Sequence, residues 1–175
     1  MRLVPGGEPF DRVLRTARTR AFHLENYDNY LATGESDSLR QFLADETTDP
    51  GGEWFTPWAD QVRRMVGDGI VMQRARIVSE PHTDYTRFLL ALARHNVAAG
   101  EDVRYLPRAD TDVVSEDFWL LDDSTVVFSL FDLRGFWSGG AATSDSRMVR
   151  HAADIRDKVW PAAIPYRDYL TRLSP

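Results

Sequence analysis

The spacing of apolar residues changes near Gly67. Before this glycine, apolar side chains recur three or four positions apart over residues 10–24, 36–44 and 54–66. This spacing is typical of helices that bury one side. After the glycine, residues 70–78 and 103–106 form short apolar runs, and Pro81 and Pro107 limit their length. We therefore expect a helical N-terminal third followed by a region that mixes strands and helices.

Two local patterns indicate how the strands connect. Apolar residues between Tyr85 and Asn96 fall on one helical face, with a start near Pro81 and a cap at Gly100. This helix joins residues 70–78 to 103–106, and a strand–helix–strand unit normally makes its two strands parallel. Farther along, residues 118–121 and 126–131 flank a short Asp-Asp-Ser turn. That pattern predicts a β-hairpin.

The C-terminal part completes the expected fold. Residues 136–142 are predicted to be an edge strand weakened by glycines, and Ser144 is predicted to cap a last helix over residues 144–163, followed by one or two turns at 166–173. The predicted class is α/β (α+β), with a mixed sheet of about four to five strands and a C-terminal helix. We expect a single domain over residues 1–175, in which a helical part (10–68) packs on an α/β part (70–173).

Composition limits the classes of function. The formal net charge of −6 and the lack of a basic block disfavour nucleic-acid binding. No apolar run approaches the roughly 20 residues of a membrane helix, and the first residues lack a signal-peptide core. We therefore expect a cytoplasmic protein without membrane contact, which the absence of cysteine also suits.

Known catalytic and cofactor motifs do not occur in the sequence. Lys158 is the single lysine, so a phosphate-loop or Schiff-base lysine in a loop is excluded. The four histidines include no pair at the spacing of a zinc motif, and the glycines do not complete a dinucleotide fingerprint. We predict neither a metal nor a cofactor.

The segment RIVSEPHTDY is the strongest candidate for a site. It follows a predicted strand, at the sheet edge where ligands of open α/β folds bind. We name the polar residues expected near this edge, together with two aromatic neighbours, the strand-end cluster: Arg76, Ser79, Glu80, Asp84, Tyr85, Arg87, Arg104, Arg108, Asp117 and Trp119. Arginine forks and the N-terminus of a helix can hold an anion there. Helix capping and local ion pairing explain the same residue types without a ligand.

Several segments together resemble a family of actinobacterial proteins of unknown function. They are RARIVSEPHTDYTRF, HNVAAGEDVRYLPR, EDFWLLDD, an N-terminal FHLE and a C-terminal VWPAAIPYRDY, and they span nearly the whole chain. The resemblance implies a regulatory or signalling role beside helix-turn-helix regulators. It also implies that the family is defined at Arg76, Ser79, Glu80, Asp84, Tyr85, Asn96, Gly100, Glu101, Asp102, Arg104, Pro107, Arg108, Asp117, Trp119 and Asp122.

A second, looser resemblance concerns the strand–helix–strand region, which is similar to phospholipase-D-like folds. Members of that superfamily need the motif H-x-K, and this sequence does not contain it. The resemblance therefore carries no phosphodiesterase activity over to this chain.

These observations lead to three hypotheses about function. The first is a non-catalytic regulatory module that binds a protein partner or a small anionic ligand at the strand-end cluster. The second is an enzyme acting on a phosphorylated or carboxylated metabolite, with Glu80, Asp84 or His82 as acid or base and arginines as clamps. The third is an accessory to a helix-turn-helix transcription regulator.

Overall fold

A computed structural model describes residues 1–30 and 35–173. The described strands form one mixed, eight-stranded sheet in the order β1-β7-β6-β5-β2-β3-β4-β8. Their bounds are β1 Arg2–Pro5, β2 Arg20–Glu25, β3 Val71–Val78, β4 Asp102–Pro107, β5 Phe118–Leu121, β6 Thr125–Phe131, β7 Trp137–Thr143 and β8 Ile164–Pro165. Strands β2, β3 and β4 are parallel, and the other neighbouring pairs are antiparallel.

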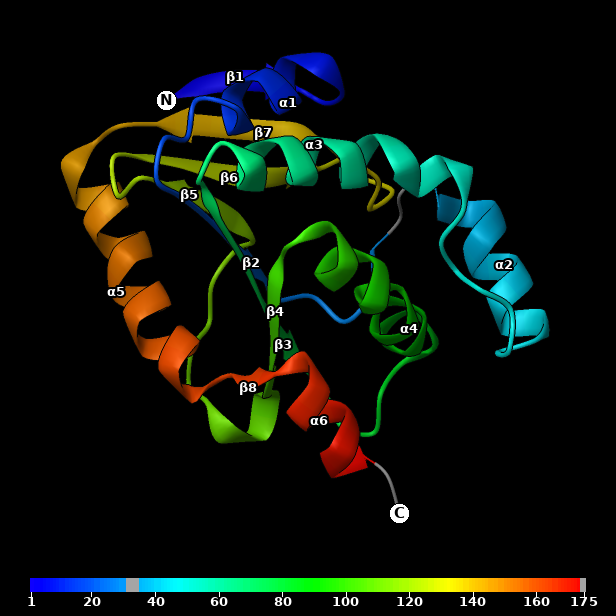
Figure 1. The fold of residues 1–175 in the computed structure, drawn as a ribbon. Helices are drawn as coiled ribbons and strands as arrows, with labels where there is room; N and C mark the ends of the chain where they lie inside the picture. The colour runs from blue at the N-terminus through cyan, green and yellow to red at the C-terminus, as the bar shows by residue number, and fades with distance from the viewer. Residues whose placement is uncertain (31–34, 174–175) are drawn as a thin grey trace.

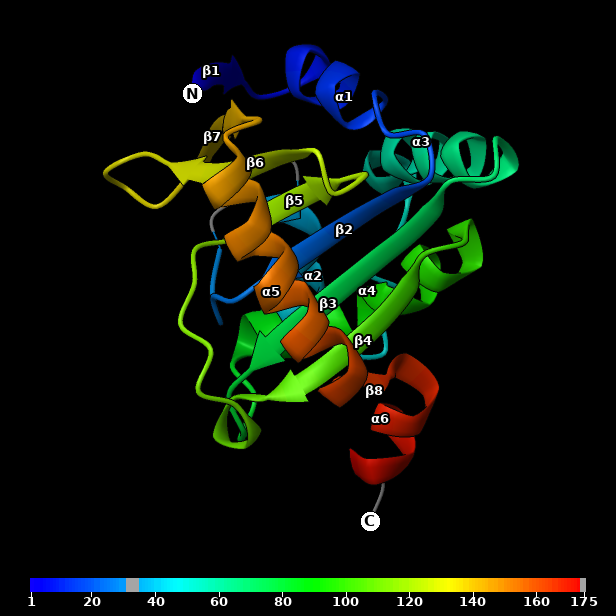
Figure 2. The ribbon, with the colours of Figure 1, turned by 90° about the vertical axis from the view of Figure 1, so that its left-hand side faces the viewer.

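Helices cover both faces of this sheet (Figures 1 and 2). The helical elements are α1 Glu8–Leu14, α2 Ser36–Ala44, η2 Glu53–Phe55, α3 Thr56–Gly67, α4 Asp84–Ala99, η3 Arg108–Asp110, α5 Ser146–Ala162 and α6 Tyr166–Leu173. One apolar cluster joins α1, α2, α3 and α4 to one face, and a second joins α5 to the other. Helix α6 packs beside β4 through Tyr169 and Tyr105, whose rings stack 4.8 Å apart.

The prediction of one helix over residues 10–24 was wrong. Helix α1 ends at Leu14, and β2 then runs through the middle of the sheet. Central strands are buried on both faces, so Ala21 and Phe22 are both buried although they point to opposite sides. Such a strand shows no two-residue alternation, and its apolar residues resembled the continuation of a helix. The N-terminal third is therefore not purely helical.

The sheet is also larger than predicted. The five expected strands are present, but β1, β2 and β8 were missed. Strands β1 and β8 are short, with four and two residues, and each contains a proline. Such short edge strands leave little pattern in a sequence.

The predicted edge strand at residues 136–142 lies inside the sheet. Strand β7 pairs with β1 on one side and with β6 on the other. Its glycines allow this close approach: a Cβ atom at Gly139 would lie 2.2 Å from the carbonyl oxygen of Val4, and one at Gly140 would lie 2.7 Å from Val127 Cγ1. From the sequence, these glycines were expected to weaken the strand. In the structure they allow β7 to pack closely against neighbours on both sides.

Most of the other local predictions are confirmed, with shifted helix starts. The strand–helix–strand unit has parallel strands, β5 and β6 form the hairpin, and Gly100 ends α4 with a left-handed conformation, φ 112°. Helix α4 begins at Asp84 rather than near Pro81, because the Thr83 side chain caps it by accepting from the Thr86 backbone N–H. Likewise, Asp145 rather than Ser144 caps α5.

Candidate functional site

The ten residues of the strand-end cluster do not converge on one site. Two lie at the carboxyl ends of β3 and β4, four lie in surface contacts, and four line a pocket beneath the helices. The first two are Ser79 and Arg108; the next four are Glu80, Asp84, Arg87 and Arg104; the last four are Arg76, Tyr85, Asp117 and Trp119.

Arg108 ties together the ends of two parallel strands. Its guanidinium donates to the carbonyl oxygens of Asn26 and Ile77 at 2.5 and 3.1 Å, and to Ser79 Oγ at 3.2 Å. The Ser79 backbone N–H and hydroxyl both donate to Asp28, at 2.8 and 2.7 Å. These bonds satisfy backbone groups that the strand ends would otherwise leave unpaired. The contacts give Arg108 a structural role.

Glu80 and His82 meet the C-terminal helix. Glu80 accepts from the Tyr169 hydroxyl at 2.8 Å and from Arg172 at 3.1 Å. His82 Nε2 lies 2.6 Å from the same tyrosine oxygen. Burial disfavours the charged form of His82 and therefore lowers its pKa. This group holds α6 against the loop before α4.

The remaining charged candidates form pairs at the surface. Asp84 and Arg87 lie 3.0 Å apart within the first turn of α4, and Arg87 also contacts Glu46 at 2.9 Å. Arg104 pairs with Asp102 at 3.0 Å. Pairs of this kind contribute about 0–1 kcal/mol and need no ligand.

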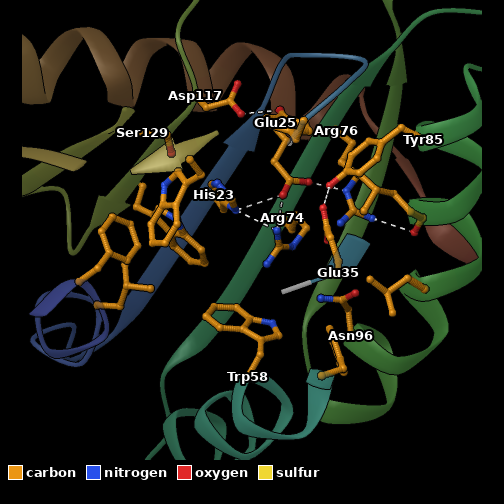
Figure 3. A pocket seen from close by; sticks show the side chains of 18 of the residues that line it. His23, Glu25, Glu35, Trp58, Arg74, Arg76, Tyr85, Asn96, Asp117 and Ser129 are labelled. Atoms are coloured by element: carbon orange, nitrogen blue, oxygen red, sulfur yellow. Dashed lines mark hydrogen bonds and ion pairs between the residues drawn. The ribbon is translucent and has the colours of Figure 1, made fainter. Parts of the chain in front are cut away.

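The four buried candidates line a pocket of about 360 Å³, which we call the central pocket. Its floor is one face of β2 and β3, and α1, α3, α4 and the strands β5 and β6 supply its walls (Figure 3). This volume falls in the range of about 300–1,000 Å³ that is typical of small-molecule sites.

Alternate residues of β2 and β3 place charges on the pocket floor. Glu25 bridges two arginines: it contacts Arg74 Nη1 at 2.5 Å and Arg76 Nε (Figure 3). Arg74 Nε also contacts Glu101 Oε2 at 2.7 Å. We name these four residues the ion cluster. Their side chains are between 1% and 13% exposed, and their formal charges cancel.

The two arginines keep Glu25 ionised. Burial alone would raise its pKa, but the attraction of Arg74 and Arg76 outweighs burial and holds that pKa well below the usual range. Arg76 Nη1 further donates to the Leu89 carbonyl at 3.2 Å and to the Tyr105 hydroxyl at 3.0 Å. Ion pairs and hydrogen bonds to other groups of the protein thus fix the positions of both guanidinium groups.

Glu101 connects the ion cluster to α3 and α4. It accepts from Trp58 Nε1 at 2.7 Å and from Asn96 Nδ2 at 3.2 Å. Asn96 is 2% exposed and lines the central pocket, and its Oδ1 atom is buried with no hydrogen-bond partner among the described residues. A buried acceptor without a donor is costly. Asn96 Oδ1 is therefore an unsatisfied acceptor in a residue that lines the central pocket.

His23 is neutral in this setting. Burial lowers its pKa to about 3, although neighbouring Glu25 favours the charged form. Arg74 Nη1 lies 2.9 Å from His23 Nδ1, and since arginine only donates, Nδ1 must be the acceptor. The ring proton is therefore assigned to Nε2. The imidazole stacks on Trp119 with ring centroids 4.1 Å apart.

Two further carboxyls are held in a partly protonated state. Burial raises the pKa of Glu35 to about 7, although a hydrogen bond from the Tyr85 hydroxyl opposes this shift. Burial likewise raises the pKa of Asp117 to about 7, against a hydrogen bond from Tyr30. Both carboxyls line the central pocket and change charge near neutral pH.

Aromatic side chains surround these polar groups. Besides Trp58 and Trp119, whose rings lie 5.7 Å apart, the wall includes an edge-to-face pair of Phe10 and Trp137 at 5.0 Å. The Arg74 guanidinium carbon lies 5.6 Å from the centre of the Trp58 ring. Trp54, Phe55 and Phe131 also line the pocket. The central pocket thus combines an aromatic wall with a few convergent polar groups.

Reasoning from sequence missed the acidic partners in this pocket. His23 lies in the segment that we assigned to a helix, Glu25 directly follows that segment, and Glu35 precedes α2 after a break in the described residues. A usable signal was the alternation in Arg74-Ala75-Arg76-Ile77, because a buried strand with arginines on one face requires acidic partners. Glu101 and Asn96 were singled out only through the family resemblance.

The described residues contain no group of three or more histidines or acids placed to hold a metal ion. No helix in the described part of the chain has the length and apolar character needed to cross a membrane.

Comparison with known proteins gives a family and no activity. A search of curated proteins found no match. Residues 8–171, which include every residue of the central pocket, match a family described as a domain of unknown function (DUF6879). The chain therefore belongs to the DUF6879 family.

Proposed function

We propose that this protein is a non-catalytic regulatory or signalling module that binds a small organic ligand in the central pocket. The observation that carries the proposal is the pocket itself, in which an aromatic wall surrounds buried ionisable groups and the unpartnered Asn96 Oδ1 atom. Ligand sites are typically concave and apolar, with a few polar groups that orient the ligand.

Energetics supports a role for the ion cluster beyond stability. Burying four charges costs desolvation energy that their attraction only partly offsets, and apolar residues of similar volume are often equally stable or more stable. Carboxyls with strongly shifted pKa values, such as Glu35 and Asp117, also gather at functional sites. Both features fall in the central pocket.

Filling the pocket tests this proposal. Ser129 lines the pocket from β6, and Ser129→Leu would occupy part of its volume (Figure 3). Ser138→Leu, at an exposed position of β7, is the matched control. The wild-type protein would be screened against a library of small metabolites by thermal shift. A ligand at 100 times its Kd adds about 2.7 kcal/mol of stability.

We expect compounds that raise the Tm of the wild type and of Ser138→Leu by several degrees, and that leave Ser129→Leu unchanged. Stabilisation of all three proteins by the same compounds would place binding elsewhere. A library without any stabilising compound would also count against the proposal.

The enzyme hypothesis has weaker support. Its acid–base candidates Glu80, Asp84 and His82 lie outside the central pocket and are engaged by α6 or by surface arginines. A helix-turn-helix regulator, as the resemblance implies, fits the proposal as the partner that reads the ligand-bound state. Binding of the purified regulator with and without ligand would test that part.

A further inference from the structure

The ionisable groups of the central pocket are unbalanced in favour of carboxyls. Arg74, Arg76 and Glu25 line the pocket, and Glu101 pairs with Arg74 from outside the lining, so the charges of the ion cluster cancel. Outside it, the described pocket lining contributes Asp11, Glu35 and Asp117, and no further arginine or lysine. Asp11 has Arg15 nearby as a counter-charge. Glu35 and Asp117 therefore lack a dedicated cation within the lining.

The hydrogen-bonding groups show the same bias. Asn96 Oδ1 is a buried acceptor without a donor among the described residues, and its amide nitrogen already donates to Glu101. Carboxylates accept only, so Glu35 and Asp117 add acceptors when ionised. A ligand that completes this pocket must bring donors.

The aromatic wall also favours a positively charged ligand. The faces of Trp, Tyr and Phe rings attract cations, and desolvated cation–π contacts contribute about 2 kcal/mol. Trp54, Trp58 and Tyr30 line the pocket together with the carboxyls. The Arg74 guanidinium already lies near two of the pocket tryptophans, within 5.7 Å of each ring centre.

We propose that the ligand of the central pocket is an organic cation, a protonated amine carried on an aromatic or aliphatic body. This inference rests on the proposed function and names the charge class of its ligand. The ammonium group pairs with Glu35 or Asp117, and the body of the ligand contacts the aromatic wall. An anionic ligand, which the arginines suggested from sequence, would meet arginines that are already neutralised and carboxyls that repel it.

The charge of the pocket makes binding depend on pH. Glu35 is faced by Tyr85 from α4, Glu25 from β2 and Arg76 from β3. Burial is the main cause that raises its pKa to about 7, so its carboxylate forms only as pH rises. A cation that binds the carboxylate must then release a proton when binding occurs below pH 7.

Asp117 behaves in the same way. It is faced by Tyr30, by the Asn26 backbone N–H, by Glu25 and by Glu116, and burial raises its pKa to about 7. If one such carboxyl must be ionised, apparent affinity follows the ionised fraction. We therefore expect about a tenfold rise in affinity between pH 6 and pH 8.

Three probes of similar size separate charge from shape: 2-phenylethylamine, 2-phenylethanol and phenylacetate. Binding of each to the full chain would be measured by isothermal titration calorimetry at pH 6 and pH 8. The amine stays protonated at both values, as lysine does. Repeating the titration at pH 6 in two buffers of different ionisation enthalpy measures proton release.

Glu35→Gln and Asp117→Asn are the test variants, and Asp37→Asn, a carboxylate of α2 that is 84% exposed, is the matched control. We expect the amine to bind at least about tenfold more tightly than the other probes at pH 8, which corresponds to about 1.4 kcal/mol. One test variant should lose both this preference and the proton release. The control should retain both.

Other outcomes would overturn the inference. Tighter binding of phenylacetate would show an anion site, and equal binding of all three probes would show that the pocket does not discriminate charge; both results leave the proposed function standing. An amine that binds without proton release, or equally to every variant, places the cation elsewhere. No binding of the amine at millimolar concentration also overturns the inference, while the library screen judges the proposed function independently.

Discussion

The two faces of β2 and β3 differ sharply although alternate residues of the same two strands form them. Under α5, Phe22, Leu24, Ala75 and Ile77 form an apolar layer that is at most 1% exposed. On the opposite face the intervening positions carry His23 and three members of the ion cluster. Alternation along a strand assigns successive residues to opposite faces.

This difference shows that the sheet does not need buried charges in order to pack. The α5 face is covered by apolar contacts alone, which is the ordinary way to stabilise a sheet against a helix. The charged face borders the central pocket, where ionised groups remain within reach of a ligand. We expect one face to serve stability and the other to serve binding.

The largest effect is expected where the ion cluster is broken. Glu25→Gln would remove the negative charge shared by Arg74 and Arg76 and should lower the free energy of unfolding by about 3–5 kcal/mol. Ile77→Ala, on the opposite face of β3, should cost a similar 2–5 kcal/mol through loss of packing. Urea denaturation at pH 7 measures both.

The two variants should differ in ligand binding. Ile77 does not line the central pocket, so Ile77→Ala should retain ligand affinity while Glu25→Gln should lose it. If Glu25→Gln lowers the free energy of unfolding by less than about 1 kcal/mol, the charged face is solvated and not buried. This conclusion requires that Ile77→Ala shows its full expected loss of about 2–5 kcal/mol.

A smaller effect should appear in the pH dependence of stability. The Glu35 carboxyl has a pKa of about 7 in the folded protein and an ordinary value near 4.5 when unfolded. The folded state therefore binds more protons between these values, and Glu35 favours folding less and less as pH rises through this window. Glu35→Gln cannot titrate at this position and lacks this pH-dependent contribution to stability.

Unfolding free energies of the wild type and of Glu35→Gln would be compared from pH 5 to pH 8. Relative to the variant, the wild type should lose stability over this range, by at most about 3 kcal/mol. Burial lowers the pKa of His23, so this residue favours folding less below pH 6.5 and its contribution to stability changes with pH in the opposite direction. Because both proteins contain His23, its contribution cancels in the comparison. A constant difference across the range would contradict the prediction.

The smallest effect is expected in the predicted site that lies outside the pocket. The Asp84 side chain is 69% exposed and pairs with Arg87 at the surface. Asp84→Ala should change the free energy of unfolding by less than about 1 kcal/mol, and the ligand-induced shift in Tm should be unchanged. Loss of the ligand-induced shift in Tm would indicate that the functional site includes the strand-end cluster.

Local pattern was sufficient for much of the fold. Residues 70–131 were assigned almost correctly because each element there has a clear signal: apolar runs, a hairpin turn and the glycine at position 100. Strand β2 was missed because burial on both faces hides the alternation of its side chains. That error also hid that His23 and Glu25 lie on one strand and face the same side of the sheet.

The candidate site was predicted only in part, for a related reason. Arg76, Tyr85, Asp117 and Trp119 were selected and do line the central pocket. Their acidic partners come from other elements: Glu25 from β2 pairs with Arg76, and Glu35 from the start of α2 accepts from Tyr85. Glu101, from the turn before β4, pairs with Arg74. Contacts over these distances in sequence carry no local pattern that identifies which charges meet.

By itself, the sequence determined the α/β class, the parallel strand–helix–strand unit, the hairpin and the presence of arginines on one face of β3. These features depend on side-chain periodicity and turn chemistry within a few residues. Only the tertiary structure decided which charges are neutralised, because burial and partner distance set both pKa values and ion pairing. It thereby moved the candidate site from an exposed strand end to a pocket whose unbalanced carboxyls favour a cation.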